Sequence, residues 1–412
     1  MGHTDKSGMS IPAPLRGSEE GTWAQSTIQE RLPKIAQRVL DENSLYQDAH
    51  IAICDLITEI PSANIRPIHD PSALDQEDWK EYTQPYLHLD WRQVPWFFAE
   101  HYFYRRIIEG VGYYKSGNGH GLDPFSHQKH LGLMTTQDDI RSLSSNLTTW
   151  LKPDFPTHSA LELLFAEALW GNQADLSLWP VGKGKKPGHS NAGQAESYLL
   201  VNDMQTTIDR LNSAIGSAPT VDVLLDNAGF ELVVDLCLTD YLLSRGVAAI
   251  VRLHAKAHPT FVSDATREDV SHTLAFFQTS DHRELAALGN RLREHIDSER
   301  LVLFSDFFWT SPLCMWEMPS QLCELFTESQ LVISKGDANY RRLLGDRHWP
   351  FTTPFNEIMS YFPAPLLALR TLKAELASGL SAEQIDNVSC LDPQWMTNGR
   401  WGIVQYAEPQ PA

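Results

Sequence analysis

Two acidic side chains and an amide stand where predicted strands end. Asp226 closes the apolar run TVDVLLD (220–226), Asn227 follows it, and Asp264 comes after the next run, VAAIVRLHA (247–255). Because the carboxyl ends of parallel strands meet at one edge of a sheet, we expect these side chains to lie close together. Carboxylate and amide oxygens are hard ligands that suit Mg²⁺, Mn²⁺ or a similar cation. The residues therefore predict a divalent metal site, with helix caps as the alternative, since Asp and Asn favour those positions.

A second run, KGDANYRRLLGD (335–346), carries groups that could bind an anion. A strand predicted over LVISKGD (331–337) contains a glycine that permits a tight turn, and a helix is expected to begin near Asn339. The free N–H groups of a helix start form an anion site, and Lys335, Arg341 and Arg342 add positive charge. A solvated basic helix face is an equally good interpretation. A metal beside an anion site indicates phosphoryl chemistry.

Further basic residues lie in FPAPLLALRTLKAEL (362–376). The prolines at 363 and 365 favour a helix start, and a helix here would place Arg370 and Lys373 on one face.

The elements that must position these residues are those of an α/β fold. Between the strands 220–226 and 247–255, the residues 230–242 follow the 3.6-residue period of an amphipathic helix, which predicts a βαβ unit with parallel strands. We expect a three-layer α/β/α sandwich with a mainly parallel sheet, plus a helical N-terminal domain. The predicted divisions are a flexible tail (1–20), a mainly helical domain (21–215) and an α/β domain that carries the site (216–412). The Gly-rich stretches 115–130 and 181–194 are predicted to be surface loops, and the second lacks the ending of a phosphate-binding P-loop.

Composition limits the classes of partner. The net charge of −19 argues against a nucleic-acid partner or an anionic membrane surface. Five cysteines without CxxC spacing indicate reduced thiols and a cytoplasmic protein, with a nuclear location left open. No apolar run approaches the ~18 residues of a membrane span. The oligomeric state is left open.

Several segments together resemble a known family. DNAGFELVVDLCLTDYLL (226–243), FVSD (261–264), KGDANYRRLLGDRHW (335–349) and the tetrapeptide RTLK (370–373) are similar to the metal-dependent damage-control phosphatases, and RTxK marks the subfamily that acts on sugar phosphates. The resemblance extends into the N-terminal half at ERLPKI (30–35) and WFFAEHYFYRRI (96–107). It covers nearly the whole chain and agrees with the α/β/α sandwich.

The resemblance implies an activity and a set of site residues. Members hydrolyse fructose 1-phosphate, fructose 6-phosphate and related esters with Mn²⁺, Co²⁺ or Ni²⁺, and Mg²⁺ is a further possibility here. Relatives have also been described as S-adenosylmethionine-dependent protein carboxyl methyltransferases, for which Glu231 and Arg31 would be candidate cofactor contacts. The implied catalytic and metal-binding residues are Asp226, Asn227 and Asp264. The implied substrate-binding residues are Asp226, Asn227, Glu231, Gly336, Asp337, Ala338, Asn339, Tyr340, Arg370 and Lys373. Arg370 could instead brace the site structurally.

Overall fold

The sheet at the centre of the molecule has seven strands. The computed structural model describes residues 10–171 and 197–410, so the predicted loop at 181–194 lies outside the described residues. The strand order is β1-β7-β6-β5-β2-β3-β4. All neighbouring pairs are parallel except β6 and β7. The strands are β1 (Leu199–Asn202), β2 (Thr220–Leu224), β3 (Ile250–Lys256), β4 (Leu301–Asp306), β5 (Ser329–Lys335), β6 (Leu366–Thr371) and β7 (Gly402–Ala407).

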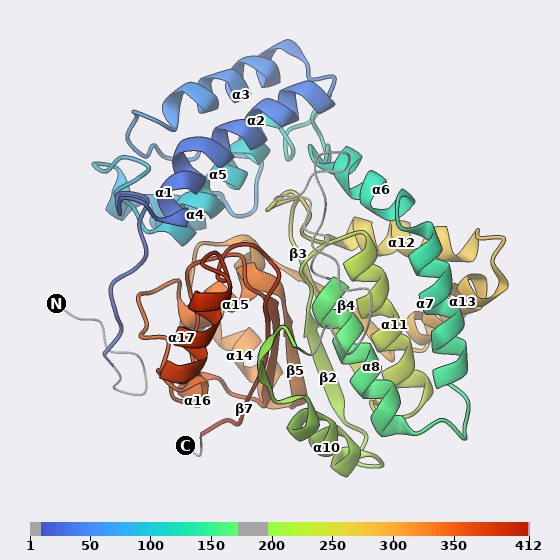
Figure 1. Ribbon diagram of the computed structural model, residues 1–412. Helices are drawn as coiled ribbons and strands as arrows, with labels where there is room; N and C mark the ends of the chain where they lie inside the picture. The colour runs from blue at the N-terminus through green and yellow to red at the C-terminus, as the bar shows by residue number, and fades with distance from the viewer. Residues whose placement is uncertain (1–9, 172–196, 411–412) are drawn as a thin grey trace.

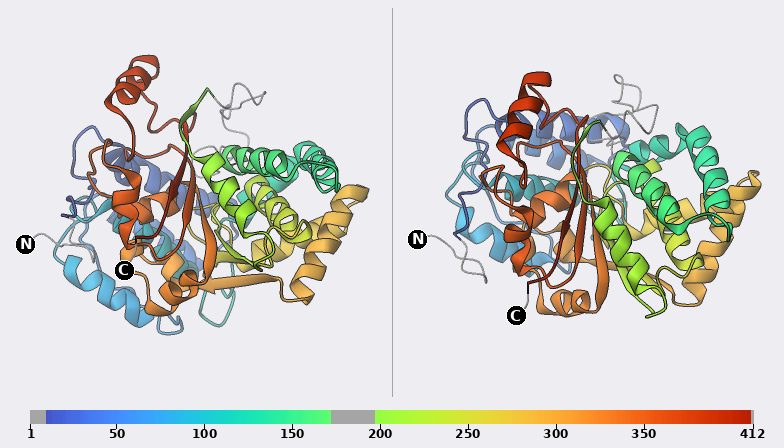
Figure 2. Two further views of the ribbon diagram at one scale, coloured as in Figure 1. Left: turned by 90° about the horizontal axis from the view of Figure 1, so that it is seen from below. Right: turned by 60° about the horizontal axis from the view of Figure 1, so that its bottom comes forward.

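Helices cover both faces of this sheet (Figure 1). Those on one face are α7 (Gln137–Trp150), α8 (Thr157–Trp170), α10 (Met204–Ala214), α11 (Phe230–Ser244), α12 (Arg267–Gln278) and α13 (Arg283–Asp297). Those on the other face are α14 (Ser320–Thr327), α15 (Gly336–Leu344), α16 (Phe355–Ile358) and α17 (Ala382–Leu391). The two views of Figure 2 show the same separation of the two helical layers by the strands.

The strands divide their side chains between the two layers. In β6, Leu367 and Leu369 belong to the core under α8 and α11, whereas Leu366 and Ala368 belong to the core under α15 and α16. This division follows from the two-residue period of a strand, and because both faces are buried the strands are apolar throughout. The predicted α/β/α sandwich with a mainly parallel sheet is therefore confirmed.

A separate group of helices forms what we call the helical lobe, residues 23–111. It contains α1 (Trp23–Ser26), α2 (Leu32–Glu42), α3 (Gln47–Glu59), α4 (Gln76–Thr83) and α5 (Trp96–Val111). Its core is rich in aromatic side chains, and it also takes in Phe261, Val262 and Ala374 from loops that follow β3 and β6. The lobe therefore packs over the edge of the sheet at which these strands end. No helix among the described residues is long and apolar enough to cross a membrane.

The structure differs from the expected divisions of the chain. Strand β1 and helices α7, α8 and α10 lie before residue 216, yet they belong to the sheet or pack in its core. A further helix, α6 (Ser126–Met134), begins within the stretch 115–130 that was predicted to be a loop. The described part of the predicted tail, 10–20, is held in place. Leu15 is buried and its N–H donates to the Asp346 carbonyl at 3.0 Å.

One predicted helix is a strand. Residues 366–371 form β6, and the expectation of a helix that begins at Pro363 or Pro365 is wrong. Because β6 is central and all six of its residues are buried, its sequence has no alternation of polar and apolar residues that would reveal a strand. Helix α15, which precedes β6 in the chain, begins earlier than predicted, at Gly336 rather than near Asn339.

Candidate active site

The strand order creates a switch point between β2 and β5. From β2 the chain proceeds through β3 to β4 on one side, whereas β5 pairs on the opposite side of β2. Such a reversal leaves a crevice at the carboxyl ends of the strands, where ligands of open α/β sheets bind. Asp226 follows β2, and Gly336, the first residue of α15, follows β5. A Cβ atom on Gly336 would lie 1.8 Å from Asp226 Oδ2, and the φ angle of this residue is +81°, so glycine is required here.

Asp226, Asn227 and Asp264 are brought together by a short antiparallel pairing. The bridge joins Asn227 to Asp264. On either side of it, the Ala265 N–H donates to the Asp226 carbonyl at 2.7 Å and the Ala228 N–H donates to the Ser263 carbonyl at 2.6 Å. All three candidate ligands are buried, with exposed fractions of 4%, 4% and 1%.

None of the three is a helix cap. The N-cap of α11 is Gly229, and that of α12 is Thr266, whose side chain forms a capping box with Asp269. The capping interpretation of Asp226, Asn227 and Asp264 is therefore wrong.

The electrostatics of this cluster favour a bound cation. Burial raises the pKa of Asp226 well above its usual value, and the nearby carboxylates of Glu231 and Asp264 raise it further against the pull of Lys256 and Lys373. Lys256 lies 3.1 Å from Asp264 Oδ2. A divalent cation between the two aspartates would stabilise their ionised forms and so relieve the repulsion.

The side-chain amide of Asn227 has a defined orientation. Its Nδ2 donates to Asp226 Oδ2 and to Glu231 Oε2, both at 2.8 Å, and its Oδ1 accepts from Ser263 Oγ at 2.5 Å. An amide oxygen has two lone pairs, so Oδ1 can accept from Ser263 and also bind a metal. Among the described residues, no cluster of three or more His, Cys, Asp or Glu side chains could hold a metal. Asp226 and Asp264 fit a cation only with Asn227 and water completing the shell, which is the predicted set.

Glu231 lies behind Asn227, away from the cavity. It is 1% exposed, and Lys335 Nζ donates to Glu231 Oε1 at 2.9 Å and to Asp235 Oδ1 at 2.8 Å. Burial raises the pKa of Asp235 to about 7, although Lys335 opposes the shift. The structure therefore gives Glu231 a supporting contact with Asn227 in place of the expected contact with substrate or cofactor.

A cavity lies between the sheet edge and the helical lobe. It encloses an empty volume of about 430 Å³, open solvent at its mouth included. From the sheet edge and the segments that follow it, the lining residues are Asp226, Asn227, Phe261, Asp264, Asp337, Ala338, Arg341 and Lys373. From the helical lobe and the π-helical turn Thr27–Arg31 within it, they are Trp23, Arg31, Trp96 and Glu100.

Several lining residues were not predicted. Trp96 and Glu100 belong to α5, in the part of the chain that was predicted only to be helical. Arg341 stacks over the Trp96 ring at 3.6 Å and forms an ion pair with Glu100 at 2.5 Å. No local sequence signal distinguishes these residues from core residues, because tertiary packing alone brings them to the cavity. Arg31, a predicted cofactor contact, does line the cavity.

The segment 336–340 is divided between the cavity and the interior. Asp337 and Ala338 line the cavity. Asn339 is buried and donates to the Leu225 and Lys335 carbonyls at 3.1 and 2.9 Å. The Tyr340 hydroxyl donates to Gln405 Oε1 at 2.8 Å, inside the core. The last two residues thus hold α15 in place and do not reach the cavity wall.

Arg370 and Lys373 also have different positions. Arg370 is fully buried and donates to Asp337 Oδ1 at 2.7 Å and to the Leu376 and Ala374 carbonyls at 2.5 and 3.1 Å. Its guanidinium lies 4.4 Å from the centre of the Tyr340 ring. Lys373 lines the cavity. Arg370 therefore braces Asp337 and the loop after β6, while Lys373 faces the ligand space.

Fold and site together define an α/β enzyme with an acidic, cation-ready cavity at the switch point of its sheet. Residues 27–388 match the family model described as the damage-control phosphatase ARMT1-like domain. The chain belongs to this family, and membership makes the protein a phosphatase and thus a hydrolase.

Relatives match over nearly the full length. Damage-control phosphatase ARMT1 of Danio rerio is 32% identical over 445 residues, with 98% of each chain covered. The proteins of the same name from Mus musculus and Homo sapiens are 33% and 32% identical over 448 and 447 residues, covering 97% of this chain and 99% of theirs. A solved DUF89 family protein from Pyrococcus horikoshii aligns with a TM-score of 0.44 and 14% identity over 87% of this chain and 95% of its own.

Proposed function

We propose that the protein hydrolyses small sugar phosphates, such as fructose 1-phosphate and fructose 6-phosphate, in metabolite damage control, with a divalent metal held by Asp226, Asn227 and Asp264. The observation that carries the proposal is the pair of buried aspartates at the switch point. The pKa of Asp226 is raised by burial and by its acidic neighbours, so the pair favours a cation there. The RTLK segment places Lys373 on the wall of the same cavity. Mn²⁺, Co²⁺ or Ni²⁺ is the proposed metal.

The roles of the chain's own residues follow from their positions. When bound, the metal would supply positive charge to the phosphoryl oxygens. Lys373 offers a second positive charge to a phosphate that must enter a protein with a net charge of −19. Asp337 is held by Arg370 at the cavity wall, where its carboxylate can accept hydrogen bonds from sugar hydroxyls. The N–H groups at the start of α15 contribute the positive end of a helix dipole.

Asp226 could act in two ways. It could attack phosphorus itself, or it could act as a ligand and base for an attacking water. Acid quench during turnover distinguishes these roles, because only the first places the phosphoryl group on the Asp226 carboxylate, where it can be trapped as a phosphoenzyme.

The position of Glu231 argues against the methyltransferase alternative, although Arg31 lines the cavity. Glu231, a candidate contact for S-adenosylmethionine, is occupied by Asn227 and Lys335 and does not line the cavity. A cofactor that reached Glu231 would have to displace Asn227.

The test is a panel of phosphate esters assayed with Mn²⁺, Co²⁺, Ni²⁺ and Mg²⁺, with and without EDTA. Turnover of S-adenosylmethionine is measured in parallel on the same preparation. We expect metal-dependent phosphate release from fructose phosphates that is lost on substitution Asp226→Asn. Methyl transfer without phosphate release would overturn the proposal.

A further inference from the structure

The loop between β3 and Asp264 contains two consecutive residues in the left-handed region. Phe261 has a φ of 47° and Val262 a φ of 69°. The other non-glycine residues with positive φ in the described part of the chain are Ala218, Glu299 and Asp346, and none of these adjoins another. Side chains disfavour this conformation, and a β-branched residue does so most strongly. Such strain persists only where the surroundings enforce it.

Packing against the helical lobe holds the two residues in this conformation. Phe261 and Val262 are 8% and 0% exposed and belong to the core of the lobe. The Phe261 ring packs against Tyr104 and His101 of α5, with both centroid separations at 4.9 Å. The same core includes Ala374, the residue after Lys373, and Ala338, the residue after Asp337, packs against it. Apolar contacts of the lobe thus adjoin three of the segments that bear site residues, namely the loop after β3, the start of α15 and the loop after β6.

The strained pair leads directly into the candidate ligands. Ser263 Oγ donates to Asn227 Oδ1, and the Ser263 carbonyl accepts from the Ala228 N–H at 2.6 Å. The Asp264 N–H donates to the Thr260 carbonyl at 3.3 Å, which closes a single turn around the strained pair. A rotation about Phe261 or Val262 would therefore move Ser263 and Asp264 away from Asn227.

We propose that Phe261 and Val262 are positioning residues. The helical lobe holds them in the left-handed conformation, and this fixes Ser263 and Asp264 in the orientation that a cation with Asp226 and Asn227 requires. Metal sites need their ligands placed within about 0.5 Å, which a relaxed loop would not provide. The inference rests on the proposed metal site, but its effect on the loop can be measured without metal.

The test compares Val262→Ala with Val262→Gly. Alanine keeps the cost of a positive φ, whereas glycine removes it, so Val262→Gly should have the higher Tm. The affinity for Mn²⁺, measured by calorimetry without substrate, should have the opposite order, with Val262→Gly binding the metal more weakly than Val262→Ala. We expect a Kd about threefold weaker for Val262→Ala and about tenfold weaker for Val262→Gly, because the glycine loop is free to relax. If Val262 had only a structural role, the variant with the higher Tm would also bind Mn²⁺ more tightly.

Hydrogen exchange supplies the readout without metal. In metal-free protein, the amides of residues 260–266 should exchange faster in Val262→Gly than in Val262→Ala, despite the higher Tm of the glycine variant. If the parent protein binds none of Mn²⁺, Co²⁺ and Ni²⁺, the metal assignment in the proposed function fails, while this exchange measurement still tests the positioning role.

Glu299 provides the matched control. It has a φ of 57° in an exposed turn before β4. Glu299→Gly should also be more stable than Glu299→Ala, with the Mn²⁺ affinity of both equal to that of the parent.

Phe261→Leu is a second variant, which removes the ring contact with α5 and should weaken Mn²⁺ binding about threefold. The proposal would be overturned if Val262→Gly kept the Mn²⁺ affinity and the amide exchange rates of the parent, or if Phe261→Leu kept the parent's Mn²⁺ affinity. It would also be overturned if Val262→Ala had a higher Tm than Val262→Gly.

Discussion

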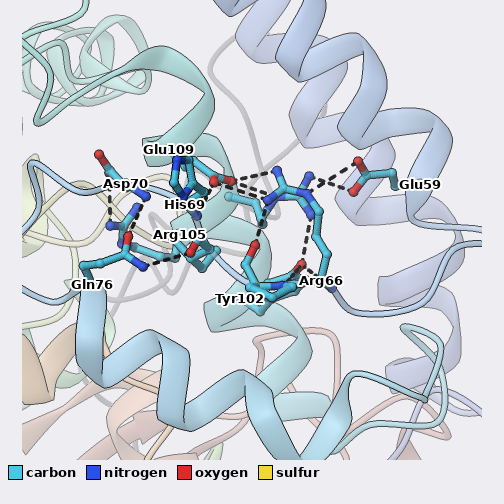
Figure 3. A network of polar contacts seen from close by, with 11 residues as sticks. Glu59, Arg66, His69, Asp70, Gln76, Tyr102, Arg105 and Glu109 are labelled. Atoms are coloured by element: carbon cyan, nitrogen blue, oxygen red, sulfur yellow. Dashed lines mark hydrogen bonds and ion pairs between the residues drawn. The ribbon is translucent and has the colours of Figure 1, made fainter.

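Two groups of charged side chains in this molecule, one partly buried and one fully buried, differ in their balance of charge. In the helical lobe, the carboxylates of Glu59 and Glu109 form ion pairs with Arg66 and Arg106. Figure 3 shows Glu59 and Glu109 on either side of this contact with Arg66. At the switch point, the four carboxylates of Asp226, Glu231, Asp235 and Asp264 share the buried ammonium groups of Lys256 and Lys335. The first group is balanced, and the second has an excess of acid.

The two groups shift the pKa values of their carboxyl groups in opposite directions. Burial opposes the charge of Glu109, but its hydrogen bond and ion pair with Arg66 lower its pKa below the usual value. For Asp226, burial and the neighbouring acids Glu231 and Asp264 act together and raise the pKa. In a balanced network every charge has a partner, so the loss of one partner costs stability, whereas an unbalanced network costs stability until a cation binds. The comparison separates a structural network from a functional one without reference to any relative.

The largest expected effect is that of Asp226→Asn. It should reduce metal-dependent phosphate release by about 10³-fold or more, because a ligand of the proposed metal is lost. The same change should make the metal-free protein more stable, since one crowded acid disappears. Activity assays, Mn²⁺ calorimetry and urea unfolding in EDTA measure these effects. Unchanged activity with unchanged metal content would refute the assignment.

The same type of change in the helical lobe should have the opposite effect on stability. Glu109 accepts from Arg66 at 2.8 Å and from the His69 N–H at 2.6 Å, and Arg106 lies 3.1 Å away. Removing its charge in Glu109→Gln leaves Arg106 buried with one partner fewer. We expect a loss of about 3 kcal/mol in the free energy of unfolding, at the lower end for a broken buried pair because Arg66 is partly exposed.

Activity per folded molecule should stay unchanged in Glu109→Gln. Urea unfolding and activity assays at a permissive temperature measure both quantities. If Glu109→Gln proves as stable as the parent, the contrast between the two networks is wrong.

A buried histidine next to the strained loop tests the pH dependence. His258 is 1% exposed, and its Nδ1 lies 3.0 Å from the Pro259 carbonyl. Burial lowers its pKa to about 4, with Asp75 and Arg105 acting in opposite directions. The folded protein therefore keeps His258 neutral where the unfolded chain would protonate it. This stability is complete above the unfolded pKa of 6.5 and is lost as the pH falls toward 4.

Between pH 7 and pH 5 this histidine should account for a loss of about 2 kcal/mol in the free energy of unfolding. Substitution His258→Gln should reduce the decline over that interval by the same amount, since the other titrating groups are common to both proteins. Urea unfolding of metal-free protein at the two pH values measures it. An identical decline in both proteins would show that His258 titrates normally.

The sequence predicted the parts of the site that depend on local pattern. Asp226 and Asn227 were selected because an apolar run ends beside them, and Asp264 because it follows the next run along the chain. Helix α11 was recognised by its helical period, and β2 and β3 by their short apolar runs. Strand β6 was missed because both of its faces are buried, which removes the alternation of polar and apolar residues. In addition, the two prolines before it are typical of a helix start. The four-residue strand β1 carries too few residues for a period to be recognised.

The far wall of the cavity could not be predicted. Trp96 and Glu100 have the spacing of core residues on α5, and their place opposite Asp226 depends on how the helical lobe packs on the sheet. Likewise, the requirement for glycine at 336 comes from the Asp226 side chain, 110 positions earlier in the chain.

The smallest expected effect concerns the positive charge that faces the acidic site. Lys373 lines the cavity, whereas Arg370, three residues earlier, is fully engaged by Asp337 and backbone carbonyls. Of these two residues, Lys373 is thus the one placed to offset the excess acid for an incoming phosphate. Lys373→Ala should raise KM about tenfold, which corresponds to about 1.4 kcal/mol, with Tm nearly unchanged. Lys80→Ala, which removes the same charge from an exposed site on α4, is the control and should leave KM unchanged. Because a lysine contributes to binding through its charge, added salt should weaken binding to the parent more than to Lys373→Ala. If KM stays within twofold of the parent, Lys373 does not meet the phosphate, and the metal with Arg31 and Arg341 of the cavity wall must offset the excess acid of the switch point.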